Sequence, residues 1–489
     1  MNTPRRSLIF PAIPEDCTRR GDNRVGSIAS RVGAAALCCI ILTACGARSD
    51  LLDVVPLEDS ADSCMSAPTT PFAKRFGDGM RQVGASIAVD RHGYPVIAGA
   101  FHGTLDLGVA TLNGPAVPPS EGDIFPEPPL ALEGRLFVAR LAPAGCAPFA
   151  RAVAGIYDSI GTTQVALAGD GAILLTASYI GVADFGGGPV NGGPTSTAIA
   201  KLTASGDHVW SHAFGGSQMI VTRPATDAQG NVYVAGFFSG WLGYDDITLG
   251  EGTSFGHDGF VAKLDPSGAL VWWKILALES QPVAGANLSV VAWPEGDVAV
   301  AGQIVTSPGA VVDFGGGPVS VVPHQTGFVT SFDASGQHRW QSLISPLVTD
   351  AQVAPSGDLV LLGVWDGKGF PIQRFDTTGA TSTPVMVGAP AAVIPSLAVG
   401  PNDEALIAAA LGPPISGLFA AAVAVSGKVL WTRTIYGQNE DGNHRVAGAF
   451  GPSGTPFLAG GFIGTMDLGP GAISTNGTAP DVFVAALPP

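Results

Sequence analysis

Basic residues are scarce in this chain of 489 residues. It has 24 lysines and arginines against 40 aspartates and glutamates, a formal net charge of −16 at pH 7, and only 13% of its residues are charged. Because binding a phosphate backbone requires concentrated positive charge, no nucleic-acid partner is expected. The chain is instead rich in glycine (67) and proline (39), with 46% hydrophobic residues. This composition predicts a folded core of short strands and tight turns.

Long hydrophobic runs are also lacking. The apolar stretch Val32–Ala44 has thirteen residues, whereas a membrane-spanning helix needs about 20. Arginines precede this stretch, so residues 1–44 are interpreted as a signal peptide. The stretch ends in Leu-Thr-Ala-Cys45, which resembles the lipobox of bacterial lipoproteins. This resemblance implies lipidation of Cys45 and export to the bacterial outer membrane or cell surface. An ordinary secretory signal is the alternative.

Cysteine is rare beyond this segment. Cys17, Cys38 and Cys39 lie in the predicted signal peptide, which leaves Cys64 and Cys146 besides Cys45. An even pair in an exported protein favours a disulfide over a metal site or a catalytic thiol. Residues 45–70 are expected to form a flexible tether ahead of the folded domain, and Cys146 is expected to begin the outer strand of its first repeat. We therefore predict a Cys64–Cys146 disulfide, with two free thiols as the alternative.

A repeated pattern organises the rest of the chain. A turn residue followed by four strand-like residues and a small pair recurs at intervals of 46 to 78 residues, close to the length of a four-stranded propeller blade. The turn residues of repeats 1 to 7 are Gly93, Gly171, Gly230, Gly296, Gly357, Asp403 and Gly454. Each copy continues with an apolar strand, usually Phe-led, and a glycine turn, and most then have an aromatic residue, as in Phe260–Leu264, Gly268 and Trp272. Four strands per repeat, a to d, predict an all-β fold.

The two ends of the repeated region are complementary. The seventh repeat stops at Leu487 without a d strand, whereas residues 71–76 have the d-strand pattern and precede the first a strand. Strand sharing of this kind would leave no open edge between the first and last repeats. We therefore predict that residues 71–489 form a seven-bladed β-propeller with four-stranded blades, closed by an N-terminal strand that completes the last blade.

Several runs resemble a known family. These are Asp227–Gly240, the DFGGGP sequences at Asp184–Pro189 and Asp313–Pro318, and Phe260–Gly268. They look like the repeats of the bacterial seven-bladed β-propeller repeat (SBBP) family, most clearly in repeats 3 and 4 and least in repeats 5 and 6, which lack DFGGG. The resemblance covers roughly residues 70–489. It implies an extracytoplasmic β-propeller, often on a lipoprotein, with no settled activity and no catalytic residues.

Acidic loops are the obvious places for a metal ion. Each DFGGG sequence supplies one aspartate, Asp184 or Asp313, whereas calcium needs six to eight converging oxygens. We expect these aspartates to accept hydrogen bonds from their own turns. The densest loop has Asp245, Asp246 and Asp258, but its spacing matches no EF-hand or zinc pattern. We predict no metal and no cofactor. If a metal did bind, Asp245, Asp246 and Asp258 would be the weak candidates for its ligands.

The sequence does not favour a quinone cofactor. Runs such as Asp265–Trp272 resemble the tryptophan-docking motif of quinoprotein propellers, which holds blades together in that family. A quinone site there would need a vicinal disulfide, and the only adjacent cysteines, Cys38 and Cys39, lie in the predicted signal peptide. No nucleophile, metalloprotease or phosphate-binding motif is present either. No catalytic residue is therefore assigned.

A mainly polar position lies seven residues before each turn residue. We call it the inner position; in repeats 1 to 7 it is occupied by Ser86, Gln164, Arg223, Ser289, Asp350, Ser396 and Ala447. Gln164, Arg223 and Asp350 are candidate channel-lining residues, with a solvated channel wall as the simpler interpretation.

The sequence thus predicts a lipid-anchored propeller of the cell envelope that acts as a non-enzymatic binding or scaffold module for an unknown protein or carbohydrate ligand. An acidic chain is repelled by anionic surfaces, so we expect membrane contact through the lipid alone. The alternative is a propeller hydrolase or lyase with a site at the central channel mouth.

Overall fold

The computed structural model describes residues 71–108, 110–114, 135–142, 147–156, 163–216, 219–252, 257–280, 288–307, 309–321, 324–345, 347–412, 417–436, 446–475, 477 and 479–488. All described residues belong to one compact unit, Leu51–Pro489. The predicted signal peptide, the tether, Cys45, Cys64 and Cys146 lie outside the described residues. Lipidation and the disulfide therefore stay predictions.

The regular secondary structure of the described residues consists of β-strands alone. Antiparallel pairing joins most of these strands in groups of four. From inner to outer strand the first groups are β2 (Gln82–Val89), β3 (Pro95–Phe101), β6 (Arg135–Arg140) and β7 (Phe149–Ile156); β8 (Gln164–Leu167), β9 (Ile173–Asp184), β10 (Pro189–Leu202) and β11 (His208–Gly216); and β12 (Ile220–Val221) with β13 (Ala225–Thr226), then β14 (Val232–Phe238), β17 (His257–Leu264) and β18 (Leu270–Ser280).

The later groups follow the same order. They are β19 (Leu288–Ala292), β20 (Val298–Thr306), β23 (His324–Phe332) and β24 (His338–Ile344); β25 (Val348–Val353), β26 (Leu359–Gly363), β27 (Gly369–Phe375) and β28 (Val385–Gly388); β29 (Ala392–Val399), β30 (Ala405–Leu411), β31 (Gly417–Val423) and β32 (Val429–Tyr436); and β33 (Val446–Phe450), β34 (Pro456–Phe462), β37 (Asp481–Ala486) and β1 (Phe72–Phe76).

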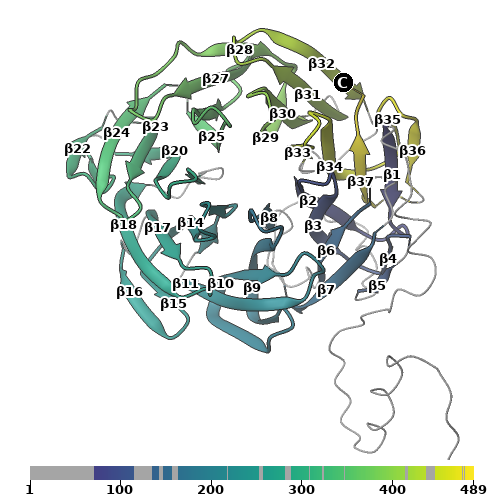
Figure 1. Cartoon of the computed structure of the whole chain (residues 1–489), viewed down its shortest axis with the longest axis horizontal. Helices are drawn as coiled ribbons and strands as arrows, with labels where there is room; N and C mark the ends of the chain where they lie inside the picture. Colours follow the sequence, from purple (N-terminus) through teal and green to yellow (C-terminus); the bar gives the residue numbers. More distant parts are fainter. Residues whose placement is uncertain are drawn as a thin grey trace, which may run out of the picture. The chain divides into compact units, whose positions relative to one another are not determined.

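These groups stand around a common axis as the blades of a β-propeller, each with its first strand innermost and its fourth at the rim (Figure 1). Inner strands of neighbouring groups contact each other, as β2 does with β8 and with β33. The strand β1 pairs antiparallel with β37, from Phe72 opposite Ala486 to Phe76 opposite Val482. The predicted all-β propeller is confirmed. Nothing in the described part of the chain is a helix that could cross a membrane.

The turn residues of the repeats share one backbone conformation. At the a–b turns, Gly93 and Gly230 have φ of 85° and 81°, in the left-handed region that glycine adopts without a steric cost. Asp403 occupies this position in the degenerate sixth copy and also has a positive φ, 60°. Aspartate is among the few other residues that tolerate this region. The sixth repeat therefore keeps the turn without the glycine.

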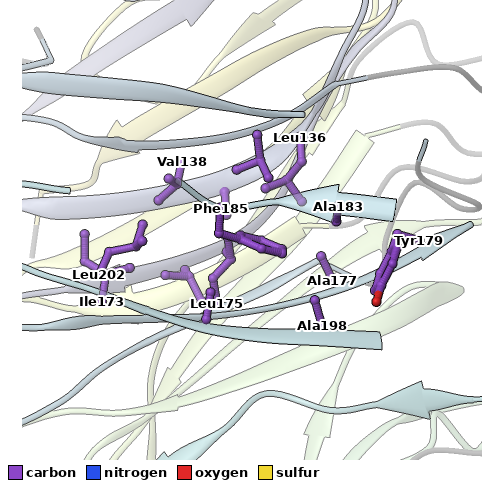
Figure 2. Close-up of a cluster of buried hydrophobic side chains, with 14 of the residues drawn as sticks. Leu136, Val138, Ile173, Leu175, Ala177, Tyr179, Ala183, Phe185, Ala198 and Leu202 are labelled. Carbon is purple, nitrogen blue, oxygen red and sulfur yellow. The ribbon is translucent and has the colours of Figure 1, made fainter. Parts of the chain in front are cut away.

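The hydrophobic cores lie between neighbouring blades. In one cluster, Leu136 and Val138 of β6 pack with Leu175 and Tyr179 of β9 and with Phe185, which follows β9 (Figure 2). Each of these side chains is almost fully buried, and such burial contributes about 1.5–3 kcal/mol per large apolar side chain. Because the two sides of this core come from consecutive repeats, a single blade could not bury it alone.

Hairpins between strands b and c reach from one repeat toward the preceding one, and we call them straps. Among the described residues they are the outer parts of β9 and β10, β15 (Trp241–Tyr244) with β16 (Ile247–Glu251), β21 (Val311–Asp313) with β22 (Pro318–Ser320), β4 (Thr104–Asp106) with β5 (Thr111–Asn113), and β35 (Thr465–Asp467) with β36 (Ala472–Ser474). The straps of repeats 2, 3 and 4 pair with β7, β11 and β18, the outer strands of the preceding repeats.

Candidate functional site on the inner strands

The inner position serves to join neighbouring repeats. In four cases among the described residues, its side chain accepts a hydrogen bond from the backbone N–H that follows the inner position of the next repeat. We call these bonds latches. They run from Val165 N–H to Ser86 Oγ (3.0 Å), Ala351 N–H to Ser289 Oγ (3.1 Å), Leu397 N–H to Asp350 Oδ2 (2.8 Å) and Gly448 N–H to Ser396 Oγ (3.1 Å).

The latches give this position a structural role, and two of its residues are too buried to form a solvated wall. Ser86 and Ser289 are only 3% and 7% exposed. A buried backbone N–H without an acceptor costs free energy, so a hydroxyl or carboxylate at the inner position satisfies a donor of the neighbouring repeat. Sequence analysis missed this role because the partner is a backbone group, which has no side-chain signature.

Asp350 is the centre of the largest inner network. Its Oδ1 accepts hydrogen bonds from Arg223 Nη2 at 2.9 Å and from Ser289 Oγ at 3.1 Å, while Oδ2 accepts the Leu397 N–H. These groups come from repeats 3, 4, 5 and 6, so one carboxylate connects four successive repeats. The side chains of Asp350 and Arg223 are 15% and 24% exposed. The structure therefore brings together two of the three candidate channel residues as an ion pair.

Gln164, the third candidate, lies on β8 and is partly buried. The residue that it would latch in the next repeat is Pro224, which has no N–H to donate. Arg223 and Ala447 cannot form a latch either, because neither side chain has an acceptor. The joints from repeat 2 to 3, from 3 to 4 and from 7 to 1 therefore lack latches.

Two of the three weak metal candidates are engaged in separate hydrogen bonds. Asp245 accepts a hydrogen bond from the Ala213 N–H at 2.9 Å, and its Oδ2 lies 2.7 Å from His212 Nδ1. Burial raises the pKa of Asp245, but the bonds from His212 and Ala213 outweigh it, so the pKa is lowered. Asp258 is buried and accepts the Leu278 N–H, while Asp246 is exposed. Among the described residues, no three acidic, histidine or cysteine side chains gather as a metal site.

The aspartates of the DFGGG sequences form turns, as predicted. Asp184 Oδ1 accepts the N–H groups of Gly186 and Gly188 at 2.7 and 3.1 Å, and Asp313 Oδ1 does the same for Gly315 and Gly317 at 2.7 and 2.9 Å. Their carboxylates are therefore used locally.

A histidine packs on each DFGGG turn. A Cβ built on Gly187 would lie 2.0 Å from the His208 ring, and one on Gly316 would lie 2.4 Å from the His338 ring. These two glycines are required because the imidazole occupies the side-chain space. Sequence analysis missed this contact although a signal was present. Repeats 2 and 4 have both DFGGG and a histidine two residues before the d-strand tryptophan, whereas repeats 3 and 6 have the tryptophan but neither of the other features.

The d-strand tryptophans dock on the next repeat. Trp210 Nε1 donates to the Pro266 carbonyl at 3.0 Å, and Trp272 Nε1 donates to the Ala334 carbonyl at 3.1 Å. Both acceptors belong to the c–d turn of the following repeat, where a Cβ on Gly268 or Gly336 would collide with the indole. These bonds have the structural role that the resemblance to tryptophan-docking motifs implies.

The described strands form a β-propeller, and comparison with known proteins adds little to this description. No family model and no curated protein sequence matches the chain. Similar solved structures include a Bacteroides caccae protein of unknown function (11% identity, TM-score 0.29, covering 48% of this chain and 68% of that one). Others are a Dyadobacter fermentans protein of unknown function (12%, 0.40, 67% and 94%) and the Hadza microbial sialidase Hz136 (9%, 0.39, 85% and 95%).

Proposed function

We propose that the protein is a non-enzymatic binding or scaffold module of the bacterial cell envelope, a divergent relative of the SBBP propellers. The observation that supports this most is the use of polar groups on the inner strands. The charges of Arg223 and Asp350 neutralise each other at 2.9 Å, and hydroxyls such as Ser289 Oγ bind neighbouring repeats. A general acid or base needs a group free to exchange a proton with substrate, so these residues favour binding over a hydrolase or lyase.

The binding role is tested with the full chain on glycan and peptide arrays, alongside chromogenic ester and glycoside substrates. Saturable binding without turnover is expected. Turnover that disappears in Asp350→Asn while the variant stays folded would establish the enzymatic alternative instead.

A lipid anchor at Cys45 is the second part of the proposal, and it rests on the lipobox resemblance alone. Labelled palmitate is expected to enter the wild-type protein and not Cys45→Ser in bacterial cells. Equal labelling of both would contradict the anchor, and the acidic chain would then need another route to the envelope.

Seven blades in a single ring, closed by β1, form the third part. The pairing of β1 with β37 and the contact of β2 with β33 support it. The buried Asp481 forms an ion pair with Arg75 of β1 at 2.7 Å, which adds a polar tie to the proposed closing strand.

Truncation tests this closure. Deleting residues 46–77 removes β1 and should lower the melting temperature of the whole domain, because the last sheet loses its outer strand. Deleting residues 46–60 should leave the melting temperature almost unchanged. Equal melting of the two truncated proteins would contradict closure by β1.

A further inference from the structure

The outer strands of the repeats differ in what lies along their free edge. In β7, β11 and β18 a strap of the next repeat pairs with the strand four or five residues after the d-strand aromatic, at Ala154, Phe214 and Ala277. The strands β32 and β1 contact the strap strands β35 and β36. The strand β28 has only four residues, and the Ala389 carbonyl just beyond it accepts a hydrogen bond from Trp365.

The strand β24 is the exception. It has seven residues, ends its sheet at the rim (Figure 1), and pairs only with β23 among the described strands. Repeat 5 has only the short link 364–368 where repeats 2 to 4 have a strap. Counted from Trp340, the equivalent seat on β24 is therefore Ile344–Ser345, and the adjacent Leu343 is 39% exposed.

The two halves of β24 also differ in charge. Arg339, near its start, forms an ion pair with Asp297, and a charged side chain of this kind discourages strand addition. The run Gln341–Ser345 has no charge. An uncharged edge with an exposed leucine presents backbone donors and acceptors that an extended chain can pair with.

We propose that the outer edge of β24, from Gln341 to Ser345, binds an uncharged, extended segment of a partner polypeptide, which adds an antiparallel strand to this blade. The straps of repeats 2 to 4 indicate this occupant, because each seats a strand at the equivalent place on β7, β11 or β18. The proposed interface continues the row of strap contacts around the rim. This inference rests on the proposed binding role and specifies the partner as polypeptide.

The probe is a fluorescent synthetic peptide with the strap sequence of residues 309–321 carrying Asp313→Asn, so that its side chains have no charge, added to the full chain. We expect saturable binding with a dissociation constant of about 0.1–1 mM, typical of a short main-chain contact. Backbone amides of Gln341–Ser345 should exchange more slowly in the complex. A peptide that is N-methylated at alternate residues should bind at least about tenfold more weakly, because it cannot make the main-chain hydrogen bonds.

Two variants locate the site. Leu343→Asp should weaken peptide binding by about tenfold or more, because it places a charge beside the seat. Val271→Asp is the matched control, since Val271 is an exposed apolar residue of β18, whose edge is already strapped. It should leave binding unchanged. Chemical unfolding of both variants checks that they remain folded.

Three results would overturn the proposal. They are no binding at about 1 mM peptide, binding without protection of Gln341–Ser345, and a concentration-dependent dimer that Leu343→Asp abolishes, which would make a second copy the occupant. If Leu343→Asp still binds on the arrays, the general binding role stands and only the proposal for the β24 edge is wrong. Loss of all array binding by the wild-type protein would instead remove the proposed function.

Discussion

Two groups of joints between neighbouring repeats are held at opposite ends of the blade. One group joins repeats 2, 3 and 4, and the other joins repeats 4, 5 and 6. In the first region, straps pair with β11 and β18 at the rim, and the inner positions Gln164 and Arg223 form no latch. In the second region, no described strap pairs with β24 or β28, and the latches of Ser289 and Asp350 tie the inner strands.

This difference indicates what a joint requires. Every joint has an apolar core, but apolar contacts are non-directional and do not fix the angle between blades. Directional hydrogen bonds do, and each joint from repeat 2 to repeat 6 has one set, at one end of the blade. Among the described residues, the joint between repeats 7 and 1 has neither a latch nor a paired strap, and there the Gln82 N–H donates to the Pro480 carbonyl at 2.8 Å. The joint between repeats 1 and 2 has both a strap on β7 and the latch of Ser86.

Asp350→Ala should cause the largest effect. It removes the latch between repeats 5 and 6 and the bond from Ser289 Oγ across the joint between repeats 4 and 5, and neither joint has a paired strap among the described strands. It also leaves the partly buried Arg223 without its carboxylate. Removing one partner of a buried ion pair costs about 3–5 kcal/mol, and partial exposure places this one near the lower limit. Guanidinium unfolding should therefore show a loss of about 3 kcal/mol.

The matched control is Asp313→Ala, which removes a carboxylate from a strap turn at the rim. It breaks only local bonds to Gly315 and Gly317 and should cost about 1 kcal/mol. Asp350→Asn should fall between the two, since its amide keeps one acceptor. An Asp350→Ala loss no larger than that of Asp313→Ala would mean that the inner latches do not hold the unstrapped joints.

Gly316→Ala tests the rim in the strapped region. The new methyl group would collide with the His338 ring, and overpacking of this kind costs about 1–3 kcal/mol. In a His338→Ala background the same change should cost much less, because the ring is gone.

Gly317→Ala separates steric collision from backbone strain. Gly317 has a φ of 103° and no atom near a built Cβ, so its substitution costs about 1–2 kcal/mol through the backbone alone. His338→Ala should not rescue it. Rescue of both glycine variants, or of neither, would show that the histidine contact is not what requires Gly316.

The sequence predicted what a single repeat determines. The DFGGG sequences predicted turns whose aspartate accepts hydrogen bonds from its own backbone, and this is confirmed. The turn residues of the repeat located the a–b turns, where Gly93 and Asp403 have positive φ. The sequence did not predict the latches or the strap pairings, because these depend on backbone groups of another repeat. Nor did the exposure of Leu343 follow from β24 itself, since it depends on a strap that the next repeat lacks.

The smallest expected effect is the pH dependence of the strap contact in repeat 2. Burial lowers the pKa of His208, and Arg151 and His212 lower it further against the opposing effect of Asp184. Its folded-state pKa therefore lies below the ordinary value near 6.5, so the unfolded chain takes up the proton first. This contribution to stability is complete above about pH 6.5 and is lost as pH falls through the folded-state pKa.

The lowered pKa of Asp245 acts only near or below its ordinary value of 3.8. We therefore expect the free energy of unfolding to decrease between about pH 7.5 and 5.5, and less steeply in His208→Gln. Some slope should remain, because burial also lowers the pKa of His257. His92→Gln, which replaces an exposed histidine, is the matched control; an identical slope in wild type and His208→Gln would mean that protonation of His208 does not act on the strapped region.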